Sequence, residues 1–235
     1  MALEDKISEV LLVIPARGGS KRIPNKNIVQ LAGKPLIAYS IEQAKSSKLV
    51  NRIIVSTDDK TIMRISENYG AEVIIRPKEI SGDTTSSESA ILHVLDYLKK
   101  KENYEPGLVV FLQCTSPVRQ QNDIDNAIKL LMQEKADSLF SACKNDKLIW
   151  ALNKNEPRAL NYDYKNRKRE QDFPNQFREN GSIYIFKTQI IKKSKNRLDG
   201  KIIIYEMGFW SSFQVDSLED LELMEWIIKN KVKYL

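Results

Sequence analysis

The 235-residue chain has few of the residues that cross-link small proteins or bind transition metals. It contains two cysteines, Cys114 and Cys143, and a single histidine, His93. Two cysteines by themselves make neither a disulfide framework nor a metal site. We therefore expect no disulfide scaffold, and we interpret Cys114 as an inert small residue and His93 as a partly buried structural residue.

Long hydrophobic runs are also missing. No stretch approaches the roughly 18 consecutive apolar residues that a transmembrane helix needs. The first ten residues, MALEDKISEV, include early acidic side chains and lack the apolar segment of a secretory signal. On these grounds we expect a cytoplasmic protein that does not span a membrane.

Glycine and proline are scarce, but cations are in excess. With 9 Gly and 8 Pro the chain does not suit a fibrous or low-complexity protein, and 42% hydrophobic residues suffice for a core. Its length suits one domain over residues 1–235. The 37 Lys and Arg outnumber the 31 Asp and Glu, which gives a net charge of +6. This balance indicates an anionic partner, and the clusters at 17–34 and 165–169 suit a polyanionic small ligand.

Strand-like and helix-like segments alternate along most of the chain. This alternation predicts an α/β protein with an open, mostly parallel sheet and helices on both faces. In such a sheet the ligand lies beyond the carboxyl ends of the strands, where the loops after residues 16, 57, 75 and 113 converge. The expected strands are 10–16, 52–57, 71–75, 108–113, 138–142, 182–186 and 202–207, and the expected helices are 35–45, 58–69 (capped by Asp58 and Asp59), 84–101, 123–135 and 218–231.

The richest segment chemically is 14–27, with the sequence IPARGGSKRIPNKN. A buried strand ends there in a loop that has two glycines and four cations. Glycines allow backbone N–H groups to approach phosphate oxygens, and cations neutralise a polyanion. The spacing matches neither a P-loop nor a dinucleotide-binding fingerprint. The loop therefore indicates a phosphate-binding site without naming the ligand.

This loop is the first of six motifs whose order resembles the acylneuraminate cytidylyltransferases, enzymes that make CMP-activated nine-carbon sialic-type acids from CTP. Each motif alone is weak, but together they span nearly the whole chain in the right order. They are ARGGSK at 16–21 with KN at 26–27, IVSTD at 54–58, RP at 76–77 with DTTSS at 83–87, LQ at 112–113 with TSPVR at 115–119, FRENGSIY at 177–184, and VD at 215–216.

The resemblance implies a three-layer Rossmann-like nucleotidyltransferase fold and a set of residue roles. Arg17, Lys21 and Lys26 would hold the CTP triphosphate, and Arg17, Lys21 and Asp216 would be catalytic. The remaining roles fall to a larger group. Cytosine and ribose would contact Asn27, Arg76, Thr85, Ser87 and the backbone near Ala16, and the 2-keto-3-deoxy sugar acid would face Gln113, Arg169, Arg178 and Asn180.

The resemblance also implies Mg²⁺ as cofactor, with Asp216 as a ligand. The family usually has two acids one residue apart here, whereas this chain reads Gln214-Val215-Asp216. Strand alternation puts positions 214 and 216 on the same side. A glutamine oxygen can ligate a hard cation but brings no charge, so we expect weaker metal binding with Gln214 than with an acid.

The segment 144–178 is polar and basic, and its apolar residues do not recur with the period of a helix or a strand. It is too long for an ordinary connection of roughly 4–6 residues, so we expect a lid, a subunit-contact arm or both. The family dimerises through an arm at this position, which makes a homodimer the expected state. The candidate contact residues are Ile149, Trp150, Leu152 and Leu160, while Leu223 and Trp226 on the last helix are interpreted as core.

Three alternatives stand beside a cytidylyltransferase for sialic, legionaminic or pseudaminic acid or an amino-Kdo. The first is a cytidylyltransferase for the eight-carbon Kdo, although SKR at 20–22 and NKN at 25–27 favour the sialic group. The second is a basic nucleic-acid-binding module, which requires a contiguous basic face with stacking aromatics. The third is a catalytically poor homologue, suggested by Gln214 but opposed by the retained cations of the first loop.

Overall fold

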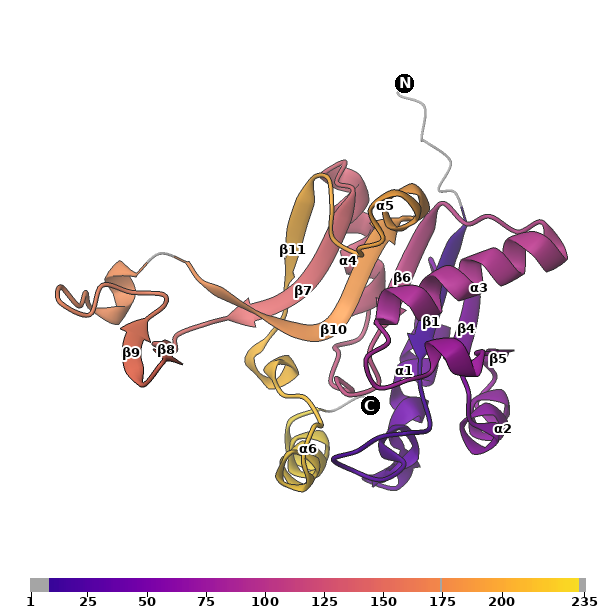
Figure 1. Cartoon of the computed structure of the whole chain (residues 1–235), viewed down its shortest axis with the longest axis horizontal. Coiled ribbons are helices and arrows are strands. Elements are labelled where there is room, and N and C mark those ends of the chain that lie inside the picture. Colours follow the sequence, from indigo (N-terminus) through magenta and orange to yellow (C-terminus); the bar gives the residue numbers. More distant parts are fainter. Residues whose placement is uncertain (1–8, 174, 233–235) are drawn as a thin grey trace.

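The computed structural model describes residues 9–173 and 175–232, so most of the N-terminal segment considered for a secretory signal lies outside it. A seven-stranded sheet forms the centre of the molecule, in the order β11-β7-β10-β6-β1-β4-β5 (Figure 1). Its strands are β1 (Val10–Pro15), β4 (Arg52–Thr57), β5 (Glu72–Ile75), β6 (Leu108–Leu112), β7 (Ser138–Lys144), β10 (Phe177–Lys187) and β11 (Ile202–Glu206).

The sheet is mostly parallel, as predicted. Strand β1 pairs in parallel with β4 and β6, and the pairs β4–β5 and β11–β7 are parallel too. Only β10, among the strands of this sheet, runs antiparallel to its two neighbours, β6 and β7. The central parallel strands β1 and β6 are nearly continuous apolar runs because helices cover both of their faces.

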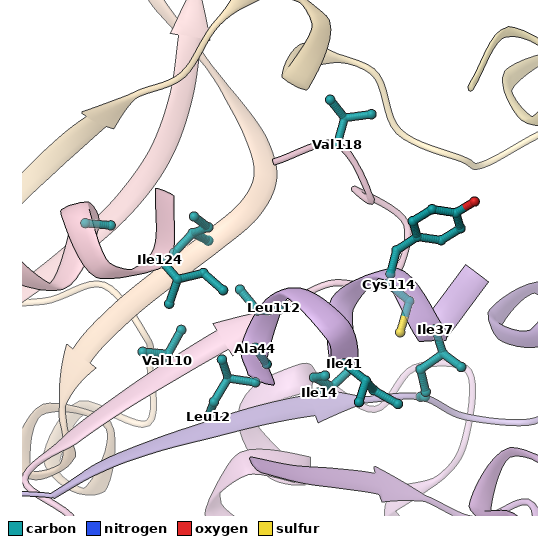
Figure 2. Close-up of a cluster of buried hydrophobic side chains, with 14 of the residues drawn as sticks. Leu12, Ile14, Ile37, Ile41, Ala44, Val110, Leu112, Cys114, Val118 and Ile124 are labelled. Atoms are coloured by element: carbon teal, nitrogen blue, oxygen red, sulfur yellow. The ribbon is translucent and has the colours of Figure 1, made fainter. Parts of the chain in front are cut away.

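Helices form a layer on each face of the sheet. One face packs against α1 (Leu36–Ser46), α2 (Lys60–Asn68), α4 (Asp123–Gln133) and α6 (Leu218–Lys231). The other packs against α3 (Ser87–Glu102) and α5 (Thr188–Ser194). Alternate residues of β1 therefore enter different cores, Leu12 the first and Leu11 the second. Figure 2 shows the first core, in which α1 lies over β1; the labelled side chains there include Leu12, Ile14, Ile37, Ile41 and Ala44.

Burial on both faces gives this sheet its stability. Every residue from Val10 to Ile14 is fully buried. Burying a side chain such as Leu or Ile contributes about 1.5–3 kcal/mol relative to leaving it in water. The binding loops that follow the strands are thus attached to the most rigid part of the chain.

The arm differs from its prediction, because 144–178 is not irregular throughout. It contains a hairpin of β8 (Trp150–Asn153) and β9 (Glu156–Ala159), joined by Lys154 and Asn155, both with positive φ. A two-residue turn with positive φ at both positions is the ordinary connection of a tight hairpin, and Asn is among the residues that tolerate it. The hairpin stands away from the sheet at the left of Figure 1.

The last third of the chain holds three further departures from the prediction. Strand β10 begins at Phe177 rather than 182, since its first residues pair with the end of β7 beyond a bulge. Helix α5 was not predicted; its seven residues are too few to show a helical period. On α6 the side chains of Trp226 and Leu223, interpreted as core, are 47% and 38% exposed, because Met224, Ile227 and Ile228 form its buried face.

Shorter elements complete the chain. A small hairpin of β2 (Gln30–Leu31) and β3 (Lys34–Pro35) precedes α1, and the single-turn helices η1 (Lys26–Ile28), η2 (Lys78–Ile80), η3 (Glu170–Asp172) and η4 (Phe209–Ser212) lie in loops. Within the described residues no helix combines the length and apolarity needed to cross a membrane.

Candidate active site

A cavity of about 560 Å³ opens at the carboxyl ends of β1 and β6. This is the edge of the sheet at which an open α/β fold binds its ligand. Five cationic side chains and two carboxylates line it, which makes it a site for an anion. The lining residues are Pro15, Arg17, Ser20, Lys21, Arg22, Lys26, Asn27, Arg76, Asp83, Thr85, Ser86, Ser87, Phe111, Gln113, Cys114, Thr115, Gln214 and Asp216.

The loop after β1 is held by contacts that its sequence requires. The Gly18 N–H donates to Asp58 Oδ1 at 3.0 Å, at the end of β4. A methyl carbon at position 18 would lie 2.9 Å from Asp59 Cβ, so this approach needs glycine. The Asn27 amide donates to the Arg17 carbonyl at 2.9 Å and closes the loop. Of the two predicted helix caps, Asp59 caps α2, whereas Asp58 holds the loop.

Asp83 neutralises two of the cations predicted to bind phosphate. Its carboxylate lies 2.5 Å from Arg17 Nη1 and 2.5 Å from Lys21 Nζ. These hydrogen bonds, from Lys21 first and then Arg17, hold the pKa of Asp83 below its usual range. A carboxylate bound to two cations occupies the kind of position that a phosphate oxygen would take.

The third predicted phosphate ligand, Lys26, lies against Asp216 on the far side of the cavity. Its Nζ donates to Asp216 Oδ1 at 2.9 Å, and only 18% of the lysine side chain is exposed. The pair links the first binding loop to the segment that precedes α6, 190 residues later. The structure thus joins two motifs that the sequence places at opposite ends of the chain.

Arg76 is buried in the wall of the cavity and oriented by β4. Its Nη2 donates to the Ser56 carbonyl at 2.7 Å, and its Nε donates to Ser56 Oγ at 3.2 Å. Burial lowers its pKa, Asp58 opposes that shift, and Arg17 adds to it. Because strand contacts set its orientation, Arg76 presents a pre-organised donor group to a ligand.

Two glutamines converge at a glycine on the side where the sugar acid is expected. Gly181 has φ +65°, and a methyl carbon there would lie 2.7 Å from Gln113 Oε1 and 2.9 Å from Gln214 Nε2. Both glutamines line the cavity. Gly181 sits in the bulge of β10, where the register with β7 shifts between Glu179 and Tyr184. The positive φ favours glycine here, and the missing side chain lets the ends of both glutamines lie against the backbone.

Most of the predicted site residues meet in this cavity, but four do not line it. Asn180, expected to face the sugar, is fully buried. Its side-chain amide accepts a hydrogen bond from Ser141 Oγ and donates one to the Ser211 carbonyl. Arg178 donates to the Ser212 carbonyl at 3.1 Å, and Arg169 lies on the arm beside Asp172. Ala16 is buried under the cavity, where its N–H donates to Ser56.

The displacements of Arg178 and Asn180 have a common physical cause. Residues 177–184 form one motif in the sequence, but side chains alternate sides along a strand, and a bulge changes the alternation. Asp83 is the main residue that sequence reasoning missed. It lies within the quoted motif at 83–87, yet a carboxylate among cations suggests no role in anion binding until its contacts are known.

A larger cavity, of about 750 Å³, lies elsewhere, between α4 and the start of α5. Its lining includes Leu108, Leu131, Met132 and Ala136. Two of its lysines are already paired, Lys187 with Asp137 and Lys192 with Glu105. Chemistry therefore selects the smaller cavity, where cations, amides and hydroxyls converge at the expected edge of the sheet.

The fold and this cavity together define an α/β protein of the nucleotidyltransferase class. The chain belongs to the cytidylyltransferase family, because the family model described as Cytidylyltransferase matches residues 11–233. It is 32% identical to a pseudaminic acid cytidylyltransferase of Campylobacter jejuni, over 93% of this chain and 96% of that protein. It is also 32% identical to an N-acylneuraminate cytidylyltransferase of Escherichia coli, over 95% of this chain but 53% of that longer protein.

A solved structure supports the fold. A CMP:2-keto-3-deoxy-manno-octonic acid synthetase in complex with CTP superimposes with a TM-score of 0.69, over 96% of this chain and 100% of that chain. The sequence identity is 18%. At that identity the likeness bears on architecture, and it agrees with the predicted nucleotidyltransferase fold.

Proposed function

We propose that this enzyme transfers CMP from CTP to the anomeric hydroxyl of a sialic-type 2-keto-3-deoxy sugar acid and releases pyrophosphate. The observation that carries the proposal is the grouping of Arg17, Lys21 and Lys26 in one cavity with Gln113 and Gln214. Relatives that act on pseudaminic and N-acylneuraminic acids, by their names, match nearly the full chain.

The cavity divides into a nucleotide side and a sugar side. On the nucleotide side Arg17, Lys21 and Lys26 bind the triphosphate, while Asn27 and the buried Arg76 face ribose and cytosine with Thr85 and Ser87. On the sugar side Gln113 and Gln214 offer both donors and acceptors to the hydroxyl and acyl groups of the acid. Asn180 and Arg178 support this wall from behind, because their side chains donate hydrogen bonds to the backbone carbonyls of Ser211 and Ser212.

The chemistry requires positioning and charge neutralisation more than a strong base. The anomeric oxygen forms a bond to the α-phosphorus and loses its proton, while the bond from that phosphorus to the pyrophosphate oxygen breaks. Negative charge grows on the leaving pyrophosphate, where Arg17 and Lys21 neutralise it. Pre-organised cations supply this stabilisation without reorganisation during the reaction.

The residues fit a magnesium ion that arrives with the nucleotide. No group of three or more His, Cys, Asp or Glu able to hold a metal occurs among residues 9–173 and 175–232. Mg²⁺ in nucleotide enzymes is commonly held by one or two carboxylates together with substrate phosphates, and Asp216, 44% exposed and facing the cavity, suits that role. We propose Asp216 as the protein ligand with Gln214 beside it; bound Mg²⁺ would neutralise phosphate charge.

A charge at position 214 should strengthen this metal site. In Gln214→Glu the added carboxylate stands on the same side as Asp216, so we expect half-maximal activity at about tenfold lower Mg²⁺. Titration of pyrophosphate release with MgCl₂ measures the shift, and Asp216→Asn should move it in the opposite direction. An unchanged midpoint in both variants would remove positions 214 and 216 from the metal site.

The experiment that tests the proposed function is pyrophosphate release with CTP and Mg²⁺ against five acids: sialic, legionaminic, pseudaminic, Kdo and 8-amino-Kdo. We expect turnover with one of the nine-carbon acids. Turnover with Kdo instead would establish the rival substrate. If none of the five acids gives pyrophosphate release while calorimetry shows that CTP binds, the proposal is contradicted for these substrates. That result would favour a catalytically poor homologue.

We further propose a homodimer formed through the arm. The support is a group of apolar side chains on the arm that lie at the surface of the single chain: Ile149, Trp150, Leu152, Leu160 and Tyr164, which are 43%, 44%, 71%, 59% and 55% exposed. Such a group is stabilised by burial against another surface.

We also propose a cytoplasmic location. The two cysteines, Cys114 and Cys143, are free thiols, which fits a reducing compartment.

A further inference from the structure

Arg119 is a charged side chain buried behind the wall of the active site. It lies in the motif TSPVR at 115–119, to which the proposed function assigns no role. Only 2% of Arg119 is exposed, and burial lowers the pKa of its guanidinium to about 10. The neighbouring Val118 is buried and belongs to the first core cluster, of which it is one of the labelled residues in Figure 2.

The guanidinium of Arg119 joins three elements. Its Nη1 donates to Gln43 Oε1 at 2.7 Å and to Ser40 Oγ at 3.2 Å, both on α1. Its Nη2 donates to the Ser182 carbonyl at 2.8 Å, on β10, and to the Gln113 carbonyl at 3.1 Å, just after β6. The planar fork of an arginine makes these contacts in one fixed geometry, which a lysine cannot reproduce.

Stability alone does not account for this residue. All four acceptors are neutral, and no ion pair of Arg119 occurs within the described residues. A buried charge carries a desolvation cost, which is offset here by hydrogen bonds to neutral groups that stand at fixed positions. An arginine in this position therefore indicates a role in fixing the geometry of the groups it contacts.

The two carbonyl groups that Nη2 contacts belong to segments that border the sugar side of the active site. Gln113 lines the cavity, and Ser182 follows Gly181, against which the side chains of Gln113 and Gln214 lie. A methyl group at Gly181 would displace the side-chain ends of Gln113 and Gln214, which lie against this glycine. A small movement of β10 relative to Gln113 would therefore change the shape of this wall.

We propose that Arg119 is a positioning residue for the sugar acid: it locks the end of β6 to the bulge of β10 and so sets the distance between Gln113 and the Gly181 backbone. This proposal rests on the proposed function for the identity of the ligand. It does not extend to the triphosphate side, because Arg119 donates to no residue of the loop at 16–27.

The kinetic test compares Arg119→Met and Arg119→Lys with the matched control Gln121→Met, an exposed amide in the same loop. With the acid that the wild type turns over, we expect kcat/KM for the acid to fall roughly 10- to 100-fold in both Arg119 variants. The dissociation constant of CTP should stay within about twofold, and the control should match the wild type. Equal losses for CTP and the acid, or no loss, would overturn the proposal.

A second measurement does not depend on turnover. Hydrogen exchange followed by mass spectrometry should show faster exchange in peptides covering 113–119 and 180–183, and in the contacted turn 40–43 of α1, in Arg119→Met, with regions remote from Arg119 unchanged. Exchange that is unchanged, or faster throughout the chain, would contradict positioning. Should Arg119→Met fail to fold, Ser40→Ala removes one bond to the same guanidinium from the α1 side and must show a smaller effect in the same peptides.

These two measurements separate the two proposals. A wild type that turns over none of the acids defeats the proposed function, whereas the exchange pattern still decides whether Arg119 locks β6 to β10. An active wild type with unaffected Arg119 variants defeats only the positioning role.

Discussion

Lys21 contacts one acidic partner and is otherwise surrounded by solvent. Its side chain is 76% exposed and pairs with Asp83 at 2.5 Å. Solvent screens an ion pair as exposed as this one, so the residue has little structural value. In the proposed function its value lies in the charge that it presents to a phosphate.

Lys21→Ala should therefore separate activity from stability. We expect turnover to fall by about two orders of magnitude or more, because a cation that stabilises the developing charge is lost. The melting temperature should stay near that of the wild type. Lys99→Ala, which removes a similarly exposed lysine paired with Glu105, is the control and should leave turnover unchanged. Normal turnover in Lys21→Ala would remove it from the phosphate site.

Asp83 holds the same cations and must release them when the triphosphate binds. Replacing its charge in Asp83→Asn should lower the KM for CTP about three- to tenfold, since the nucleotide no longer competes with a bound carboxylate. Glu105→Gln, which alters another exposed carboxylate held by two lysines, is the matched control. A raised KM for CTP would show instead that Asp83 assists nucleotide binding.

At the scale of elements, β10 decides the shape of the sugar side. It is the one antiparallel strand of the described central sheet, and its bulge turns Asn180 into the core and leaves Gly181 against Gln113 and Gln214. Sequence reasoning recognised the motif but assigned Asn180 to the ligand. Only pairing with β7 determines which side each of these residues takes.

Gly181→Ala tests this bulge. The positive φ disfavours alanine by about 1–2 kcal/mol, and the new methyl group would collide with both glutamines. We expect a lower melting temperature and a loss of at least about tenfold in kcat/KM for the sugar acid. Gly208→Ala is the control, because a methyl group there meets nothing within 4 Å and its φ is −68°. Wild-type kinetics in Gly181→Ala would contradict the assignment of this wall.

The arm was predicted as an interruption but not as a hairpin. Lys154 and Asn155 form the two-residue turn of this hairpin. The strands that they join, β8 and β9, have only four residues each, which is too short for a clear strand pattern in the sequence. Trp150 packs against Tyr162 and Tyr164, contacts between residues that are not adjacent in the chain. Elements of this length depend on such packing, so propensity alone does not reveal them.

At the scale of the whole molecule, the proposed homodimer depends on exposed leucines of the arm. Leu152→Asp should shift the enzyme toward monomer, because a charge replaces an apolar group in the buried contact. Sedimentation velocity over a range of protein concentrations measures the change. Leu218→Asp alters an exposed leucine outside the arm, 61% exposed at the start of α6, and should leave the assembly unchanged. A monomeric wild type, or a dimeric Leu152→Asp, would contradict the role of the arm.

Local sequence patterns and tertiary contacts determine different features of this protein. The sequence by itself determined the α/β class, the parallel strands and the phosphate loop, because buried strands and glycine–cation loops have local patterns. It also placed the chain among cytidylyltransferase-like proteins through six ordered motifs. Only the tertiary structure decided that Asp83 holds Arg17 and Lys21, that Lys26 meets Asp216, and that Arg119 is buried behind Gln113. These are contacts between residues far apart in the chain, and their partners are set by sheet order, bulges and loop packing rather than by any local pattern.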